Sequence, residues 1–115
     1  MHEFSIAMSI IEGATEEAQR HGCGKVRAVH LKLGALSGVD KDSLLFSYEL
    51  ACEGTALEGS RLVIEEIPVT AFCPRCEVER ALASMQRMSC PVCGAPTPRV
   101  AQGREIELVG LEVAA

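Results

Sequence analysis

Residues 73–93 read CPRCEVERALASMQRMSCPVC, and this stretch decides the organisation of the chain. It holds two Cys-x-x-Cys pairs, Cys73 with Cys76 and Cys90 with Cys93, separated by thirteen residues. Two pairs at this spacing are typical of a site in which four thiolates bind one zinc ion tetrahedrally. Because four protein ligands leave no position for water or substrate, the pattern predicts a structural zinc site without catalysis.

The same pairs also allow a redox function, in which one Cys-x-x-Cys forms and breaks a disulfide as in thioredoxin-like enzymes. Two arguments favour zinc over this alternative. The second pair is close in sequence to the first, and the chain shows no βαβ context. A further cysteine, Cys52, shares the apolar face of a predicted helix and is interpreted as core packing.

The composition sets the size and the location of the protein. With 115 residues the chain has room for one domain, or for a small domain carrying a metal-bound lobe. Apolar residues make up 48% and aromatic residues only 3%, so the core must be aliphatic. No apolar run is long enough for a membrane helix, and the start MHEF lacks the features of a signal peptide. We therefore expect a cytoplasmic protein, whose thiols stay reduced.

The charge argues against nucleic acid as a partner. The formal net charge is −5, and zinc bound by four thiolates adds about −2. One stretch departs from this balance, because between Cys73 and Arg104 five arginines face only two acidic residues, Glu77 and Glu79. The arginines are Arg75, Arg80, Arg87, Arg99 and Arg104. This local excess leaves a zinc-ribbon adaptor for nucleic acid or protein as the alternative function, although interleaved aromatic residues are missing.

Periodic apolar residues predict the regular elements of the first half. Steps of three and four residues predict an amphipathic helix over residues 4–20, ended by Gly22 and Gly24. Alternation predicts a strand over residues 26–33, and a second helix follows Asp40. The apolar face of that helix is formed by Leu44, Leu45, Tyr48 and Cys52.

Two further strands, over residues 61–69 and 106–113, enclose the cysteine-rich stretch. The sequence thus predicts an α+β fold with two helices packed on a small, mainly antiparallel sheet and an inserted, four-cysteine zinc-ribbon-like lobe. We expect residues 1–69 with 100–115 to form an α/β domain and residues 70–99 to form a zinc-binding domain.

The first three residues are a second candidate metal site. Initiator methionine is not normally removed before a residue as large as histidine, so we expect Met1 to keep a free amine. That amine, the Nδ1 and backbone nitrogen of His2, and a nitrogen or oxygen of Glu3 can surround one ion in a plane. Nickel(II) and copper(II) favour such tetragonal arrangements. Alone, this motif is a poor predictor of a metal site, because many proteins begin with Met-His by chance and a solvated chain end is the commoner interpretation.

In combination, these features resemble the HypA/HybF family of hydrogenase maturation factors. The resemblance rests on the initiating Met-His-Glu, on LGALSGVD at residues 33–40, on the two Cys-x-x-Cys pairs and on Gly103-Arg104-Glu105 before a short terminal strand. One detail departs from the usual pattern, because Glu77 follows the first pair where many zinc knuckles have glycine.

The resemblance implies a nickel metallochaperone, not an enzyme, that delivers Ni(II) to the large subunit of a nickel–iron hydrogenase with a HypB-type GTPase. The implied nickel ligands are Met1, His2 and Glu3, in the α/β domain, and the zinc ligands are the four cysteines. Asp40 is a further candidate nickel ligand, although its place before a helical pattern suits an N-cap equally well. No nucleic acid or membrane partner is expected, and a homodimer is left open.

Overall fold

The chain forms two compact units in the computed structural model, which describes residues 2–22, 24–82 and 87–114. The first unit comprises residues 1–32, 38–65 and 107–115, and the second comprises residues 33–37 and 66–106. In the part of the chain that the structure describes, no helix is long and apolar enough to cross a membrane.

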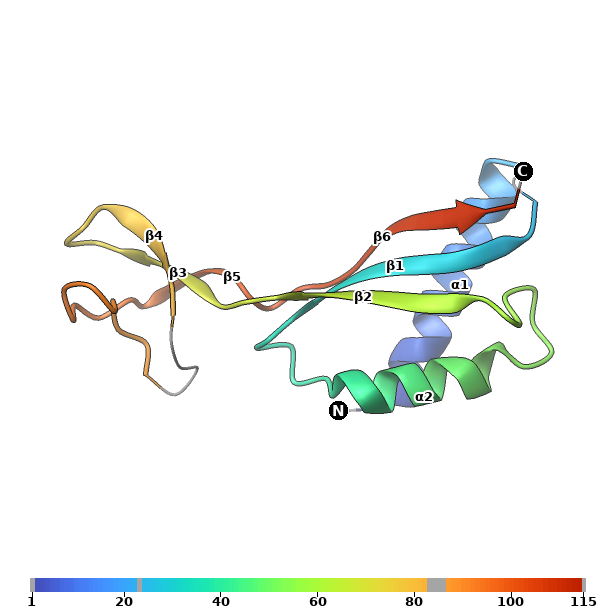
Figure 1. Ribbon diagram of the computed structural model, residues 1–115, viewed down its shortest axis with the longest axis horizontal. Helices are drawn as coiled ribbons and strands as arrows, with labels where there is room; N and C mark the ends of the chain where they lie inside the picture. Colours follow the sequence, from blue (N-terminus) through green and yellow to red (C-terminus); the bar gives the residue numbers. More distant parts are fainter. Residues whose placement is uncertain (1, 23, 83–86, 115) are drawn as a thin grey trace. The chain divides into compact units, whose positions relative to one another are not determined.

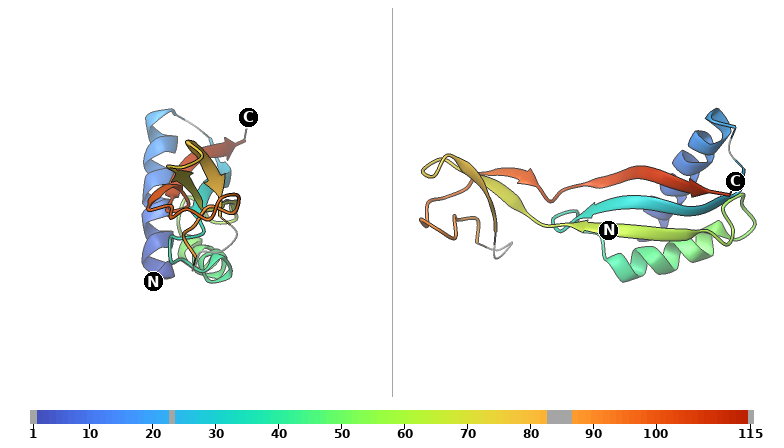
Figure 2. Two further views of the ribbon diagram at one scale, coloured as in Figure 1. Left: turned by 90° about the vertical axis from the view of Figure 1, so that its left-hand side faces the viewer. Right: turned by 45° about the horizontal axis from the view of Figure 1, so that its top comes forward.

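The first unit contains both helices, α1 (Glu3–Arg20) and α2 (Lys41–Cys52), as the periodicity predicted. Each helix buries one face, α1 through Ala7, Ile10, Ile11 and Ala14 and α2 through Leu44, Tyr48, Ala51 and Cys52. The helices pack against each other and beside a sheet (Figure 2). That sheet has the strand order β2-β1-β6, with β1 at Val26–Gly34, β2 at Arg61–Ile67 and β6 at Ile106–Val113 (Figure 1). The predicted α+β fold is confirmed.

The directions of these strands correct one expectation. The Ala35 N–H donates to Ile67 O (3.0 Å), whereas the Ala114 N–H donates to Lys25 O (2.8 Å). Strand β1 is therefore parallel to β2 and antiparallel to β6, and α2 forms the crossover of a βαβ unit (Figure 1). The expectation that the chain lacks a βαβ unit was wrong, although both cysteine pairs follow that unit in sequence.

The second unit is built on an antiparallel sheet of three short strands in the order β4-β3-β5. They are β3 (Thr70–Cys73), β4 (Val78–Ala81) and β5 (Arg99–Gln102). The sequence predicted one strand over residues 61–69, but β2 ends at Ile67 and β3 begins at Thr70. Pro68 explains the break, because it has no N–H to donate to a strand ladder.

Two glycines from distant segments meet in this second unit. The Gly34 N–H donates to Glu105 O (2.7 Å) and the Leu36 N–H donates to Gly103 O (2.6 Å). A Cβ at Gly34 would lie 2.2 Å from Gly103 O, and Gly103 itself has φ 124°. Only glycine allows this approach of the two backbone segments.

Candidate metal centre

Four sulfur atoms of the second unit form the main candidate site. The Sγ atoms of Cys73, Cys76, Cys90 and Cys93 all lie within 4.8 Å of one another. The structure thus brings together the four cysteines that the spacing singled out. Cys73 and Cys90 are buried and the other two are partly exposed, and none forms a disulfide.

The sulfur distances fit a tetrahedral thiolate site. Cys73 Sγ lies 3.4 Å from Cys93 Sγ, and Cys76 Sγ lies 4.0 Å from Cys90 Sγ. A zinc ion with Zn–S bonds of about 2.3 Å requires sulfur atoms roughly 3.8 Å apart. The four residues therefore fit one ion of this size and coordination, and no fifth donor is needed.

Each cysteine pair folds into a tight turn with the same backbone bond. The Glu77 N–H donates to Cys73 O (2.7 Å), and the Gly94 N–H donates to Cys90 O (2.8 Å). The residues after the two pairs both have positive φ, 58° at Glu77 and 77° at Gly94. Glu77 is the only non-glycine residue with positive φ among the described residues. Glu77, which stands where many zinc knuckles have glycine, thus changes the residue type but keeps the same turn shape.

Backbone N–H groups in these turns prepare the sulfur atoms for a cation. The Cys76 N–H donates to Cys73 Sγ (3.3 Å) and helps to lower the pKa of Cys73. The N–H groups of Cys93 and Val92 lower the pKa of Cys90 to about 6, although burial opposes them. The Ala95 N–H lowers the pKa of Cys93, but burial and the neighbouring sulfur atoms outweigh it and raise that pKa to about 11. The two turns therefore favour the thiolate form of Cys90 and the thiol form of Cys93.

Arg80 is a residue of this site that sequence reasoning missed. Hydrogen bonding to Cys76 and the charges of Cys76 and Cys90 raise the pKa of Arg80, although burial opposes them. The sequence placed Arg80 only among five arginines of a basic stretch. The available signal was strand alternation from Val78, which places Arg80 and Val78 on one face.

The N-terminal residues lie at the start of α1, in the first unit. His2 is exposed and forms the N-cap, and its carbonyl accepts the first helical bond from the Ile6 N–H (3.2 Å). Glu3 is the first residue of the helix, and its Oε2 accepts from the Asp40 N–H (3.3 Å). Met1, the remaining predicted nickel ligand, lies outside the described residues.

Asp40 is the N-cap of α2, as one of its two interpretations predicted. Its Oδ2 accepts from the Ser43 N–H (2.8 Å), and hydrogen bonding to the Ser43 side chain and to this N–H lowers the pKa of Asp40. The contact with Glu3 places the starts of the two helices side by side. Glu3 and Asp40 thus lie together, although they are far apart in sequence.

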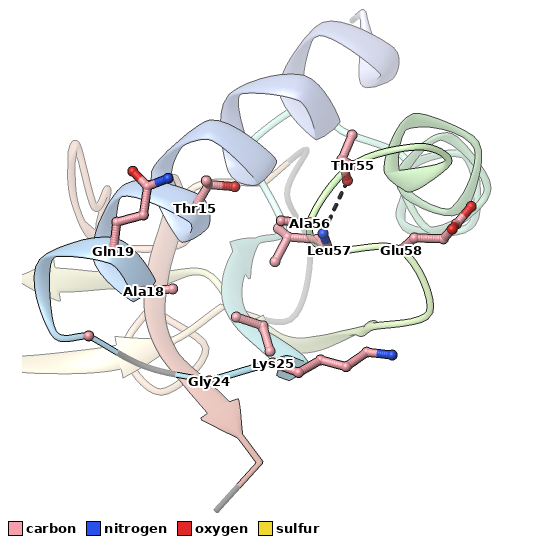
Figure 3. Close-up of a pocket in the computed structure, with 11 residues that line it drawn as sticks. Thr15, Ala18, Gln19, Gly24, Lys25, Thr55, Ala56, Leu57 and Glu58 are labelled. Atoms are coloured by element: carbon pink, nitrogen blue, oxygen red, sulfur yellow. Dashed lines mark hydrogen bonds between the residues drawn. The ribbon is translucent and has the colours of Figure 1, made fainter.

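A hollow of about 530 Å³ lies toward the other end of α1 (Figure 3). It is lined by the end of that helix, the start of β1 and the loop between α2 and β2. Within it the Leu57 N–H donates to Thr55 Oγ1 (3.2 Å). Its charged lining residues are Lys25 and Glu58, without imidazole or sulfur among the described ones. This lining does not suit a transition metal.

Comparison with known proteins shows the family of the chain. A family model described as "Hydrogenase/urease nickel incorporation, metallochaperone, hypA" matches residues 1–113. The chain belongs to the HypA family. A hydrogenase maturation factor HypA from Roseiflexus sp. is 49% identical over 112 residues, covering 97% of this chain and 91% of that protein. The corresponding protein from Chloroflexus aurantiacus is 47% identical, with 97% and 98% covered.

Solved structures agree with this membership. The solution structure of the Ni metallochaperone HypA from Helicobacter pylori matches with a TM-score of 0.71 at 26% identity. The match covers 100% of this chain and 99% of that one. HypA proteins are hydrogenase maturation factors and metallochaperones, so the family is one of metal carriers and not of enzymes.

Proposed function

We propose that this protein carries Ni(II) for the maturation of a nickel–iron hydrogenase and that it binds the ion through Met1, His2 and Glu3. The observation that carries the proposal is the position of His2 and Glu3 at the first turn of α1 in a member of the HypA family. The four cysteines hold a structural zinc ion in this proposal.

The start of a helix suits a nickel ion that is carried and released. The first N–H groups of a helix have no acceptor within it, so the backbone nitrogens of His2 and Glu3 are free to bind metal without breaking α1. His2 is exposed, which gives a partner access to the ion. Glu3 is held at the start of α2 by the Asp40 N–H, so Asp40 offers its carboxylate as an additional ligand.

The cysteine site suits a permanent ion. Its four ligands come from two turns of the second unit, and the spacing of their sulfur atoms leaves no open position for exchange. We therefore assign residues 1–69 with 100–115 as the nickel-binding domain and residues 70–99 as the zinc-binding domain.

The partners in this proposal are a HypB-type GTPase and the hydrogenase large subunit. The chain itself contains no Gly-x-x-x-x-Gly-Lys-Ser/Thr motif, so GTP hydrolysis belongs to a partner. A cytoplasmic location places the protein with reduced thiols, as the zinc site requires.

Nickel titration of the untagged, zinc-loaded protein tests the proposal. We expect His2→Ala to abolish stoichiometric nickel binding and to leave one zinc per chain. His21→Ala is the matched control, because His21 is also exposed near α1 but pairs with Glu17 (3.3 Å) at the other end. Equal nickel binding by the wild type and His2→Ala would refute the N-terminal site.

The same titration separates the two roles of Asp40. Asp40→Ala removes the cap and the candidate ligand, whereas Asp40→Asn keeps a capping oxygen and removes the charge. If Asp40 binds nickel, both variants weaken nickel binding. If Asp40 only caps α2, both leave nickel affinity unchanged and Asp40→Ala alone lowers the Tm.

A further inference from the structure

The strand register of the second unit turns one arginine toward the cysteine site. Strand β3 pairs with β4 so that Ala71 lies opposite Arg80 and Cys73 lies opposite Val78. Side chains of directly opposite residues lie on the same face of a sheet. Arg80 therefore shares a face with Cys73, which is fully buried, and with Ala71.

The guanidinium group of Arg80 is partly withdrawn from water at this face. Its Nε is buried and lacks a hydrogen-bond partner among the described residues. The neighbouring sulfur atoms of Cys76 and Cys90 raise the pKa of Arg80, with hydrogen bonding to Cys76 the largest cause. A buried donor is costly unless an acceptor compensates for it, and thiolate sulfur atoms are the acceptors at hand.

The negative charge of the metal centre explains how a cation at Arg80 can stabilise it. Four thiolates around one divalent ion carry a net charge of about −2 in a partly buried place. Cations and hydrogen-bond donors around the ligands stabilise such a centre and hold the ligands in orientation. Arg80 supplies both a permanent charge and a planar set of N–H donors.

We propose that Arg80 is a positioning residue of the tetrathiolate centre, donating N–H groups to Cys76 Sγ and offsetting the charge that Cys76 and Cys90 share. This inference rests on the proposed zinc site, and it assigns to this centre a cation from outside the two cysteine turns. If Arg80 contacts the cysteine site, it does not contribute to a basic surface that could bind nucleic acid or protein, which the alternative zinc-ribbon adaptor function would require.

The sheet provides a matched control for this role. Arg99 lies in β5 opposite Phe72, on the other face of the same three-stranded sheet, and it is exposed. Arg80→Gln and Arg99→Gln thus remove the same charge from the same unit, but only the first removes it beside the sulfur atoms.

The experiment compares the full-length wild type, Arg80→Gln, Arg80→Lys and Arg99→Gln with two readouts. The first is zinc affinity by competition with a chelator. The second is the sulfur-to-cobalt charge-transfer band after Co(II) replaces zinc. For Arg80→Gln we expect about 10-fold weaker zinc binding, the usual loss when a ligand's outer partner is removed. We also expect the band to move to lower energy, because an N–H donor stabilises the sulfur electrons.

Arg99→Gln should stay within about 2-fold of the wild type with an unshifted band, as for an ordinary surface change. Arg80→Lys keeps the charge and should recover part of the affinity. Arg80→Gln indistinguishable from Arg99→Gln in both readouts would overturn the proposal. Weaker binding without a band shift and without recovery in Arg80→Lys would also overturn it, because packing would then explain the loss.

Two further outcomes keep the test decisive. If Arg80→Gln does not fold, Arg80→Met carries the test, because it keeps the apolar stem and has no N–H donor. An unshifted band in that variant contradicts the proposed N–H donation. If the wild type binds neither zinc nor cobalt through sulfur, the proposed zinc site itself fails. A wild type with normal bands and insensitive Arg80 variants instead refutes only the role of Arg80.

Discussion

The two candidate metal sites are assembled in opposite ways. The cysteine site draws its ligands from two turns, after β3 and before β5, and exists only when the second unit is folded. The N-terminal site draws His2 and Glu3 from consecutive positions at the start of α1, so sequence alone keeps them together. A site made by folding shares its stability with the fold, whereas a site at a chain end can gain and lose an ion at little structural cost. This difference matches a permanent ion in one place and a transported ion in the other.

The largest expected effect comes from removing a ligand of the folded site. Cys90→Ser should lower zinc affinity on the order of 1,000-fold and lower the stability of the second unit, because metal binding and folding are coupled there. Bound zinc per chain and protease susceptibility measure the two consequences. Cys52→Ala is the control, since Cys52 is a buried free thiol of α2 outside the cluster and should keep its zinc. A Cys90→Ser protein that retains zinc and folds normally would remove the contrast between the sites.

The metal-free cysteine site should show its own pH dependence. The pKa of Cys90 is lowered from 9.0 to about 6, so the thiolate adds stability above pH 9 that is lost as the pH falls toward 6. The pKa of Cys93 is raised to about 11, so its contribution is lost as the pH rises from 9 to 11. We expect the metal-free second unit to be most stable near pH 9.

Ultraviolet thiolate absorbance of the metal-free protein checks this expectation. One ionisation should occur near pH 6 in the wild type and in Cys52→Ala, and it should be missing in Cys90→Ser. All thiols ionising together near their ordinary pKa would show that the turns do not prepare the site for a cation.

The smallest expected effect distinguishes the two cysteine turns. Glu77 has φ 58° where the second turn has Gly94 with φ 77°, and a non-glycine residue there is strained. Glu77→Gly should therefore raise the free energy of unfolding of the zinc-loaded protein by roughly 1 kcal/mol, and Gly94→Ala should lower it by a similar amount. Denaturant unfolding measures both changes. A destabilising Glu77→Gly would mean that the glutamate side chain has a role the turn shape does not require.

Local patterns predicted a large part of the fold and of the cysteine site. The helix starting near Phe4, the helix capped by Asp40 and the four cysteines all follow from spacing or capping within a few residues. The rest depends on contacts between distant segments. Neither the parallel pairing of β1 with β2 nor the position of Arg80 on the same sheet face as Cys73 can be obtained without the strand register. Pro68 could have predicted the break between β2 and β3, but the Ile and Val content of the surrounding residues favoured one continuous strand over residues 61–69.

The meeting of Gly34 with Gly103 has a consequence for biosynthesis. Residues 33–37 belong to the second unit, but their hydrogen-bond partners Ile67, Gly103 and Glu105 are synthesised much later. Closing so long a segment is entropically costly and slow compared with forming α1 or α2. The ribosome therefore releases the four cysteines before residues 33–37 can form their hydrogen bonds to Gly103 and Glu105 and complete the second unit. We expect the newly made chain to pass through a stage in which the four cysteine thiols have been synthesised but the second unit that buries them has not yet folded.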